Sequence, residues 1–99
     1  MIIAIDLGGT KIRAGLIDGG NISQIIYEPC RADGSEEDVL NQLFSMIDSL
    51  MCPGVTAIGI GVPSVVDAAQ GIVYDVVAIP SWKEVHLKDI LESKYGMPA

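Results

Sequence analysis

Short apolar runs and strict alternation dominate the N-terminal part of the chain. Residues 2–6 form a brief run rich in β-branched side chains, which predicts a buried strand. Residues 11–17 alternate between apolar positions and polar or small ones, which predicts a second strand with two distinct faces. Residues 18–21, Asp-Gly-Gly-Asn, predict a tight hairpin, because glycine and asparagine adopt a positive φ at little cost. A third strand is expected over residues 22–28, where Pro29 ends it.

After residue 35 the period of the apolar positions changes to that of a helix. The apolar side chains recur at spacings of three and four residues and predict one buried stripe: Val39, Leu40, Leu43, Phe44, Ile47, Leu50 and Met51. The opposite face is expected to be polar: Asn41, Gln42, Ser45, Asp48 and Ser49. Ser35 and Asp38 have the spacing of an N-cap with its capping box. The dipeptide Pro53-Gly54 is expected to end the helix.

The remainder of the chain predicts one longer strand followed by short elements. Residues 55–62 form an apolar run of strand length. A small hairpin is expected between residues 65–67 and 72–74, a loop over 79–82 and a short helix over 87–95. Three strands, a helix and a fourth strand, in that order, predict a mixed α/β sheet. Its fourth strand should lie parallel to its first.

The composition fits one small globular domain. Of the 99 residues, 49% are hydrophobic and 19% are charged, which supplies enough apolar surface for a core and argues against disorder. Six basic residues against 13 acidic ones give a formal net charge of −7. We therefore expect neither a nucleic acid nor an acidic membrane as partner, because both need a basic patch. A small phosphate ligand stays compatible with this charge, since backbone N–H groups can bind phosphate.

The sequence carries no sign of export or of membrane insertion. No apolar run is long enough to span a bilayer. The first cation, Lys11, follows the first apolar run instead of preceding it, unlike a secretory signal. Cys30 and Cys52 lie far apart without the spacing of metal ligands, so we expect two free thiols. These features predict a cytoplasmic protein.

The stretch from Asp6 to Lys11 has the residues of a phosphate-binding turn. Gly8 and Gly9 allow backbone N–H groups to approach anionic oxygens closely, Thr10 adds a hydroxyl donor, and Lys11 adds a positive charge. Asp6 would repel a bare phosphate, but it is well suited to Mg²⁺, which commonly binds one or two carboxylates together with substrate phosphates. The alternative is a plain β-hairpin in which Asp6 caps the turn.

Three segments of the chain together resemble the ROK family of sugar kinases and repressors: residues 3–16, residues 58–67 with 71–73, and residues 79–83 with 87–91. They occur in the family's order and extend over essentially the whole sequence. The resemblance implies a ribonuclease H-like fold of the actin-like ATPase and sugar kinase superfamily, in which two lobes enclose ATP and the sugar. Residues 1–99 would then be an incomplete N-terminal lobe with a β-β-β-α-β mixed sheet.

The resemblance also assigns roles to residues. Gly8, Gly9, Thr10 and Lys11 would contact the phosphates of ATP, and Asp6 would assist Mg²⁺, directly or through water. The sugar would be bordered by a turn that contains Gly61, Pro63 and Ser64, and by the loop before Trp82. The Trp82 ring could stack on a sugar, or it could be a packing anchor instead.

Several features depart from the family pattern. Many members have glycine at the position of Ser64 and asparagine at the position of Ala78, and the latter difference weakens the case for ordinary hexose binding. The catalytic aspartate of the family follows a strand that should begin at about Pro98. We therefore expect no catalytic base within these 99 residues, and no sugar phosphorylation by this chain alone. The family's zinc-binding cysteine cluster is also not expected here.

Two functions follow from the resemblance. The first is part of an ATP-dependent hexose kinase, similar to glucokinase, with a nucleotide and a small sugar as ligands. The alternative is a sugar-responsive repressor, whose helix-turn-helix would precede the first strand; Met1 adjoins that strand, which favours the kinase. A homo-oligomer is expected. The chain alone is also expected to self-associate, through the open edge of the fourth strand or through an uncovered apolar face.

Overall fold

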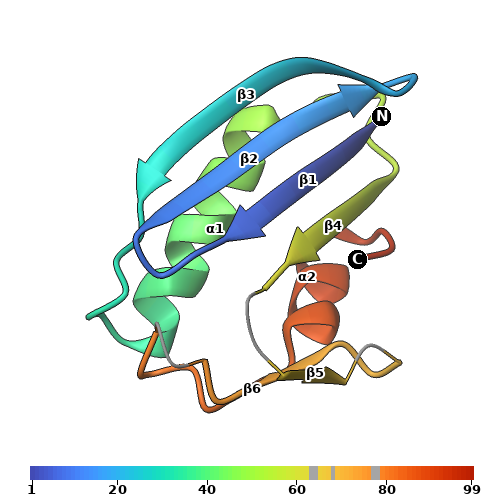
Figure 1. Ribbon diagram of the computed structural model, residues 1–99. Coiled ribbons are helices and arrows are strands. Elements are labelled where there is room, and N and C mark those ends of the chain that lie inside the picture. Colours follow the sequence, from blue (N-terminus) through green and yellow to red (C-terminus); the bar gives the residue numbers. More distant parts are fainter. Residues whose placement is uncertain (63–64, 68, 77–78) are drawn as a thin grey trace.

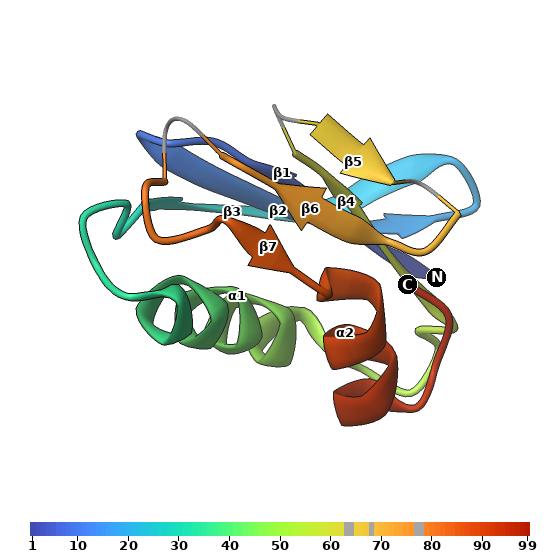
Figure 2. The same ribbon diagram turned by 90° about the horizontal axis from the view of Figure 1, so that it is seen from below.

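The computed structural model of the chain describes residues 1–62, 65–67, 69–76 and 79–99. Its elements follow one another as β1 (Ile2–Leu7), β2 (Lys11–Asp18), β3 (Asn21–Pro29), α1 (Glu36–Leu50), β4 (Ala57–Gly61), β5 (Val65–Asp67), β6 (Ile72–Tyr74), β7 (Glu84–Val85) and α2 (Leu87–Tyr95) (Figure 1). Seen from below, both helices lie on the same side of the long strands (Figure 2). We call this side of the sheet the inner face and the opposite side the outer face.

The main sheet has the strand order β3-β2-β1-β4. Adjacent strands are antiparallel from β3 to β1, and β4 lies parallel to β1. This confirms the predicted mixed sheet. The fourth strand begins later than predicted, at Ala57, because the Val55 N–H donates to the Cys52 carbonyl and closes a turn there.

The hairpin between β2 and β3 forms as its glycines predict. Gly19 has φ 58° and Gly20 has φ 83°, a backbone conformation that favours glycine. Asp18 is paired with Asn21 across the turn. The register shifts between Leu16 and Ile17, which marks a bulge beside the hairpin.

Helix α1 packs on the inner face of the sheet. Its predicted capping box is present, since the Asp38 N–H donates to Ser35 Oγ and the Ser35 N–H donates to Asp38 Oδ2. The helix and the strands β1 and β2 contribute these side chains to the core: Ile3, Ile5, Leu7, Ile12, Ala14, Leu16, Val39, Leu40, Leu43, Met46, Ile47 and Leu50. The apolar side chains on the inner face of the strands and those along the apolar stripe of α1 thus form one core layer.

One residue of the expected polar face of α1 is buried instead. Gln42 is only 3% exposed, so its predicted position on the solvent face was wrong. Its Oε1 accepts from the Arg31 N–H at 2.9 Å, and its Nε2 donates to the Pro29 carbonyl at 2.6 Å and to Glu28 Oε1 at 3.2 Å. The chain leaves β3 here and its backbone groups need partners, which the amide supplies.

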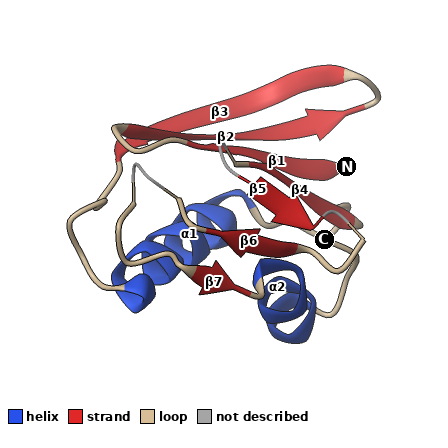
Figure 3. Cartoon of the chain, turned by 60° about the horizontal axis from the view of Figure 1, so that its bottom comes forward, coloured by secondary structure: helices blue, strands red, loops and turns tan. Residues whose placement is uncertain are grey.

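The C-terminal part forms a second, smaller sheet with the order β5-β6-β7 (Figure 3). The expected hairpin of β5 and β6 is present. Gly71, the residue directly before β6, has φ 67°, a backbone conformation that favours glycine. Strand β7 lies where no strand was predicted, because two residues are too short to show a period. It lies antiparallel to β6.

Beyond α2 the chain returns to the main sheet. Gly96 ends the helix with φ 66°, in the left-handed conformation typical of a C-terminal glycine. Two residues later, the Pro98 carbonyl accepts from the Ile58 N–H at 2.9 Å. The last residues therefore lie against β4, the edge strand of the main sheet.

Candidate functional site

The turn between β1 and β2 is closed by its own backbone. The Gly8 N–H donates to the Lys11 carbonyl at 3.1 Å. A Cβ at Gly8 would lie 2.9 Å from that same oxygen, so the turn itself requires glycine here. The Gly8 N–H is therefore already used, and a ligand would have to be bound by the N–H groups that follow it.

Two N–H groups of this turn stay available. Among the residues that the structure describes, the amides of Gly9 and Thr10 donate to no backbone acceptor. The Thr10 carbonyl accepts from the Cys30 N–H at 2.9 Å, which fastens the turn to the end of β3. Successive N–H groups held in a rigid turn can bind an anion. The plain-hairpin alternative explains Gly8 equally well, but it assigns no task to these two amides.

Asp6 lies at the carboxyl end of β1, between two neighbouring strands. It is paired with Arg13 of β2 on one side and with Gly61 of β4 on the other. The pairing with Gly61 brings two predicted site residues from distant parts of the sequence together. Because β1 and β4 are parallel, their carboxyl ends meet at one end of the sheet, where ligands of open α/β sheets commonly bind.

The Asp6 carboxylate fits a Mg²⁺ ion that is bound mainly by phosphate oxygens and water. Its side chain is exposed, and the one ion pair found among the described residues joins His86 and Glu84 instead. Mg²⁺ keeps several waters and often takes a single protein carboxylate with substrate phosphates. No group of three or more His, Cys, Asp or Glu within the described ranges could hold a metal ion without such a ligand.

Lys11 and Arg13 converge on an aromatic ring that the sequence did not single out. Lys11 Nζ lies 5.3 Å from the ring centroid of Tyr27, and the Arg13 guanidinium carbon lies 5.6 Å from it. Arg13 is paired with Tyr27 across β2 and β3, and Lys11 is two residues away on the same face. The alternation of β2 already places both cations on one face, but their meeting at Tyr27 depends on the register with β3. The result is a small positive region beside the Gly8–Lys11 turn.

The expected sugar-bordering residues are only partly described. Gly61 is exposed at the end of β4 beside Asp6. Pro63, Ser64 and Ala78 lie outside the described residues.

The structure decides between the two interpretations of Trp82. Its side chain is 0% exposed and belongs to the hydrophobic core, so its ring is not free to stack on a sugar. The backbone N–H of Trp82 donates to the Ile79 carbonyl and the backbone carbonyl of Trp82 accepts from the Val76 N–H, both at 2.9 Å. Trp82 is therefore a packing anchor that holds this loop on the core, which confirms the second of the two interpretations.

The two cysteines are free, as the sequence predicts. Burial raises the pKa of the Cys30 thiol, so the thiol form persists at neutral pH. Cys52 lies at the opposite end of α1, where its sulfur is 3.9 Å from that of Met1. Neither cysteine belongs to a metal cluster in the described part of the chain.

Comparison with known proteins agrees with these observations. The sequence profile described as "ROK family" matches residues 2–99. A glucokinase from Thermotoga maritima is 32% identical over 100 residues, which cover 96% of this chain and 31% of that protein. A putative xylose repressor from a Caldicellulosiruptor species is 33% identical over 109 residues, covering 99% of this chain and 26% of the repressor. The chain thus spans less than a third of the length of these relatives.

A solved structure extends the similarity to three dimensions. The structure of a ROK family glucokinase from Streptomyces griseus, in complex with glucose and AMPPNP, superimposes with a TM-score of 0.85 at 29% identity. The match covers 98% of this chain and 31% of the glucokinase. The fold is therefore that of one part of a ROK sugar kinase, of the actin-like ATPase type, as the sequence predicted. From the profile match over residues 2–99 and the shared fold, it follows that the chain belongs to the ROK family.

Proposed function

We propose that this chain is part of the nucleotide-binding N-terminal lobe of an ATP-dependent sugar kinase similar to glucokinase. The observation that carries the proposal is the meeting of the Gly8–Lys11 turn, Asp6 and Gly61 at one end of the sheet. The glucokinase relatives and the Streptomyces griseus structure with glucose and AMPPNP support the same activity.

Each residue of the turn has a separate task in this proposal. The N–H groups of Gly9 and Thr10 donate to phosphate oxygens of ATP, with the Thr10 hydroxyl as a further donor. Lys11 neutralises phosphate charge, and Gly8 keeps the turn closed. Asp6 orients Mg²⁺, which neutralises the charge that develops on the phosphates during transfer. The arrangement positions a nucleotide, but it supplies no base for a sugar hydroxyl.

The sugar is the second ligand in this proposal. It would be bordered by Gly61 and, as the resemblance implies, by Pro63 and Ser64. A hexose is the substrate class that the glucokinase relatives suggest.

A sugar-responsive repressor is the second candidate. It is favoured by one specific observation, the 33% identity to a putative xylose repressor. The two candidates differ in their nucleotide: a kinase lobe must bind MgATP, whereas a repressor needs only the sugar. Binding of MgATP to the turn therefore separates them.

The test is a titration of the ¹⁵N-labelled chain with MgATP, monitored at the amides of Gly9, Thr10 and Lys11. We expect saturable shifts at these amides, and weaker binding by about tenfold in Lys11→Met, since a charge-assisted contact to phosphate is lost. Lys94→Met is the matched control, because Lys94 lies on α2 over the rings of Phe44 and Tyr95. Shifts that are absent, or that are equal in both variants, would refute the kinase proposal.

We further propose a cytoplasmic location and a homo-oligomeric parent protein, with zinc bound only by parts of that protein outside this chain. No helix among the described residues is long and apolar enough to cross a membrane. For self-association of the chain alone, the outer face is favoured over the β4 edge, since Pro98 already occupies the Ile58 N–H. No nucleic acid is expected as a partner, given the net charge of −7.

A further inference from the structure

We propose that Gln42 of α1 is a positioning residue for the Gly8–Lys11 turn: it fixes the end of β3, and the end of β3 fixes the turn. This inference rests on the proposed function, in which the turn binds MgATP. Gln42 is 3% exposed and is the one buried polar side chain among the residues that the structure describes. A buried amide costs free energy unless its donors and its acceptor are bonded, so its partners show what it does.

The amide of Gln42 holds the chain on both sides of Cys30. Its Nε2 donates to the Pro29 carbonyl at 2.6 Å, and its Oε1 accepts from the Arg31 N–H at 2.9 Å. Between these two contacts, the Cys30 N–H donates to the Thr10 carbonyl at 2.9 Å. One side chain of the helix and one carbonyl of the turn therefore fix the backbone of three consecutive residues.

The Thr10 carbonyl connects the turn to the end of β3. Outside the strand ladders, and within the described ranges, no other backbone hydrogen bond joins the Gly8–Lys11 turn to another part of the chain. The directions of successive carbonyl and N–H groups are tied together, because each peptide unit is planar and only two angles per residue can turn. A shift of the Cys30 N–H would therefore reorient the amides of Gly9 and Thr10, the proposed donors to phosphate.

The two backbone contacts of Gln42 specify an amide. Pro29 presents an acceptor and Arg31 presents a donor, so the side chain between them needs one donor and one acceptor. An ionised carboxylate could accept from Arg31, but it could not donate to Pro29. It would also lie beside Glu28, whose Oε1 is 3.2 Å from the Gln42 Nε2. A leucine would bond neither group.

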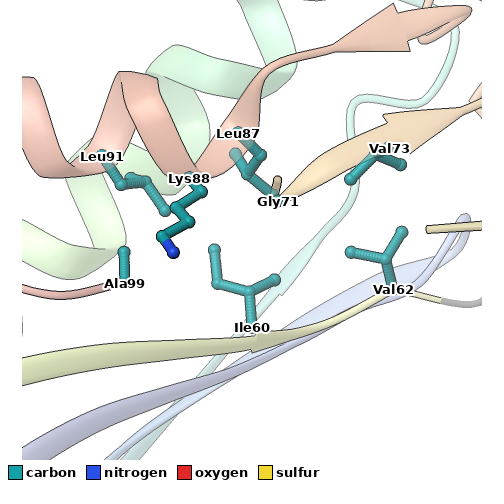
Figure 4. A pocket seen from close by; sticks show the side chains of 8 residues that line it. All are labelled: Ile60, Val62, Gly71, Val73, Leu87, Lys88, Leu91 and Ala99. Carbon is teal, nitrogen blue, oxygen red and sulfur yellow. The ribbon is translucent and has the colours of Figure 1, made fainter. Parts of the chain in front are cut away.

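A purely structural role for Gln42 is the alternative. Its loss would then lower the stability of the fold, but the folded chain would still present the turn correctly. A variant that destabilises the fold without a contact to the end of β3 separates the two roles. Leu91→Ala is that control, because Leu91 of α2 is 1% exposed and lines the groove beside β4 (Figure 4). β4 and β3 are the opposite edges of the main sheet.

The test compares ¹⁵N-labelled Gln42→Leu and Leu91→Ala with the parent chain, under conditions in which all three are folded. In Gln42→Leu we expect shifted amide signals at Gly9 and Thr10 without any nucleotide. MgATP should bind about fivefold more weakly to this variant, since the donors to phosphate are misdirected. In Leu91→Ala the amide signals of the turn should stay in place, and the affinity should stay within about twofold of the parent.

Hydrogen exchange at the Cys30 amide gives a second measurement, which needs no nucleotide. Cys30 follows the end of an edge strand, where amides exchange by local opening. Its exchange should therefore become about tenfold faster in Gln42→Leu and stay within about twofold in Leu91→Ala. The amides of the core should exchange faster in both variants, because both lower the stability of the fold.

Gln42→Glu keeps the proposal falsifiable if Gln42→Leu does not fold. When protonated, its carboxyl carries one donor and one acceptor, as glutamine does; when ionised, it has no donor for Pro29 and is repelled by Glu28. A buried carboxyl beside another carboxylate takes up its proton at a higher pH than an exposed one. The affinity of Gln42→Glu for MgATP should therefore lie below that of the parent at about pH 8, and approach it at about pH 5.

Different outcomes separate the positioning role from the structural one. Shifts at Gly9 and Thr10 with weaker MgATP binding in Gln42→Leu, and neither in Leu91→Ala, support the proposal. Equal effects of the two variants, or an unchanged affinity in Gln42→Leu, would overturn it. If the parent chain binds no MgATP, the proposed function fails. The positioning role then stands if the two amides still shift in Gln42→Leu alone, and it falls with the proposed function if they do not.

Discussion

Both faces of the main sheet carry large apolar side chains, but the two faces have opposite surroundings. On the inner face every core side chain of β1 and β2 is at most 7% exposed beneath α1. On the outer face the large apolar side chains are 38–65% exposed: Ile2, Ile22, Ile25 and Tyr27. Gly15 adds a hollow there, since Ile22 and Ile25 lie over it at 3.8–3.9 Å from a Cβ built at that position. When a strand has apolar residues on both faces, its sequence therefore does not show which face is covered by other elements of this chain.

The largest expected effect comes from a single cavity on the covered side. Leu43→Ala should lower the free energy of unfolding by ~2–5 kcal/mol, because Leu43 is 0% exposed between α1 and the sheet. Ile22→Ala is the control on the uncovered side. It should change stability by less than ~0.5 kcal/mol, since Ile22 is 65% exposed. Urea unfolding of both variants measures the difference, and equal losses would contradict the contrast between the faces.

The next effect concerns Gln42, a buried polar side chain of the inner layer. Gln42→Leu keeps the volume but leaves the Arg31 N–H and the Pro29 carbonyl without their partner. We expect a loss of ~1–3 kcal/mol, the cost of an unsatisfied buried group. Asn41→Leu, at the exposed neighbouring position, is the control and should be nearly neutral. If Gln42→Leu leaves the free energy of unfolding unchanged, apolar contacts alone hold α1 against β3.

Gln42 also illustrates what the sequence can predict and what it cannot. The period of the apolar residues was sufficient for β1–β3, α1 and α2, because each element is long enough to repeat it. Gln42 looks like any residue of a polar helix face, and only the path of the chain after Pro29 makes it a buried partner. Strand β7 is too short to show a pattern.

The candidate site divides in the same way. Asp6 and the turn up to Lys11 were predictable, because their chemistry is local in the sequence. The pairing of Asp6 with Gly61 follows once the fourth strand is placed parallel to the first. The cations at Tyr27 depend on the register of β2 and β3, which the periodicity alone does not supply. The core position of Trp82 depends on how its loop folds back onto the sheet.

A third prediction compares two glycines, one in a closed turn and one on the uncovered face. Gly8→Ala places a Cβ 2.9 Å from the Lys11 carbonyl and must distort the turn. It should cost ~1–2 kcal/mol of stability and abolish the MgATP-dependent shifts of the turn. Gly59→Ala has open space around its Cβ and should do neither. Thermal unfolding and the MgATP titration test both, and a Gly8→Ala variant that still binds MgATP would refute the requirement for glycine in this turn.

A fourth prediction concerns the contact between the two inner helices. The Tyr95 hydroxyl donates to Asp48 Oδ1 at 2.9 Å and to the Phe44 carbonyl at 3.3 Å. Burial, followed by the bond to Asp48, raises the pKa of Tyr95 above its ordinary value. Because the pKa is raised in the folded chain, the protonated Tyr95 hydroxyl contributes its full stabilisation of the fold below a pH of about 10, the pKa of tyrosine in the unfolded chain. This contribution is lost as the pH rises above that value.

Tyr95→Phe should therefore cost ~0.5–1.5 kcal/mol at pH 7, and this difference should shrink at higher pH. Urea unfolding between pH 7 and 11 measures it. Tyr27→Phe is the control, because Tyr27 is 52% exposed on the outer face. A difference between Tyr95→Phe and the parent chain that stays constant up to pH 11 would contradict the role of the hydroxyl.

Substitutions on the outer face should have the smallest effect on stability and a clear effect on association. Replacing Ile22 and Ile25 together by threonine should change the free energy of unfolding by less than ~1 kcal/mol, since both side chains are largely exposed and threonine suits a strand. An exposed apolar face of this kind is expected to bind another apolar surface, so light scattering of the parent chain should rise with concentration and that of the double variant should rise less. Ile60→Lys, at the β4 edge, separates the two routes. If Ile60→Lys suppresses association while the double variant does not, the chains associate through the strand edge. The outer face then stays exposed to solvent without causing association.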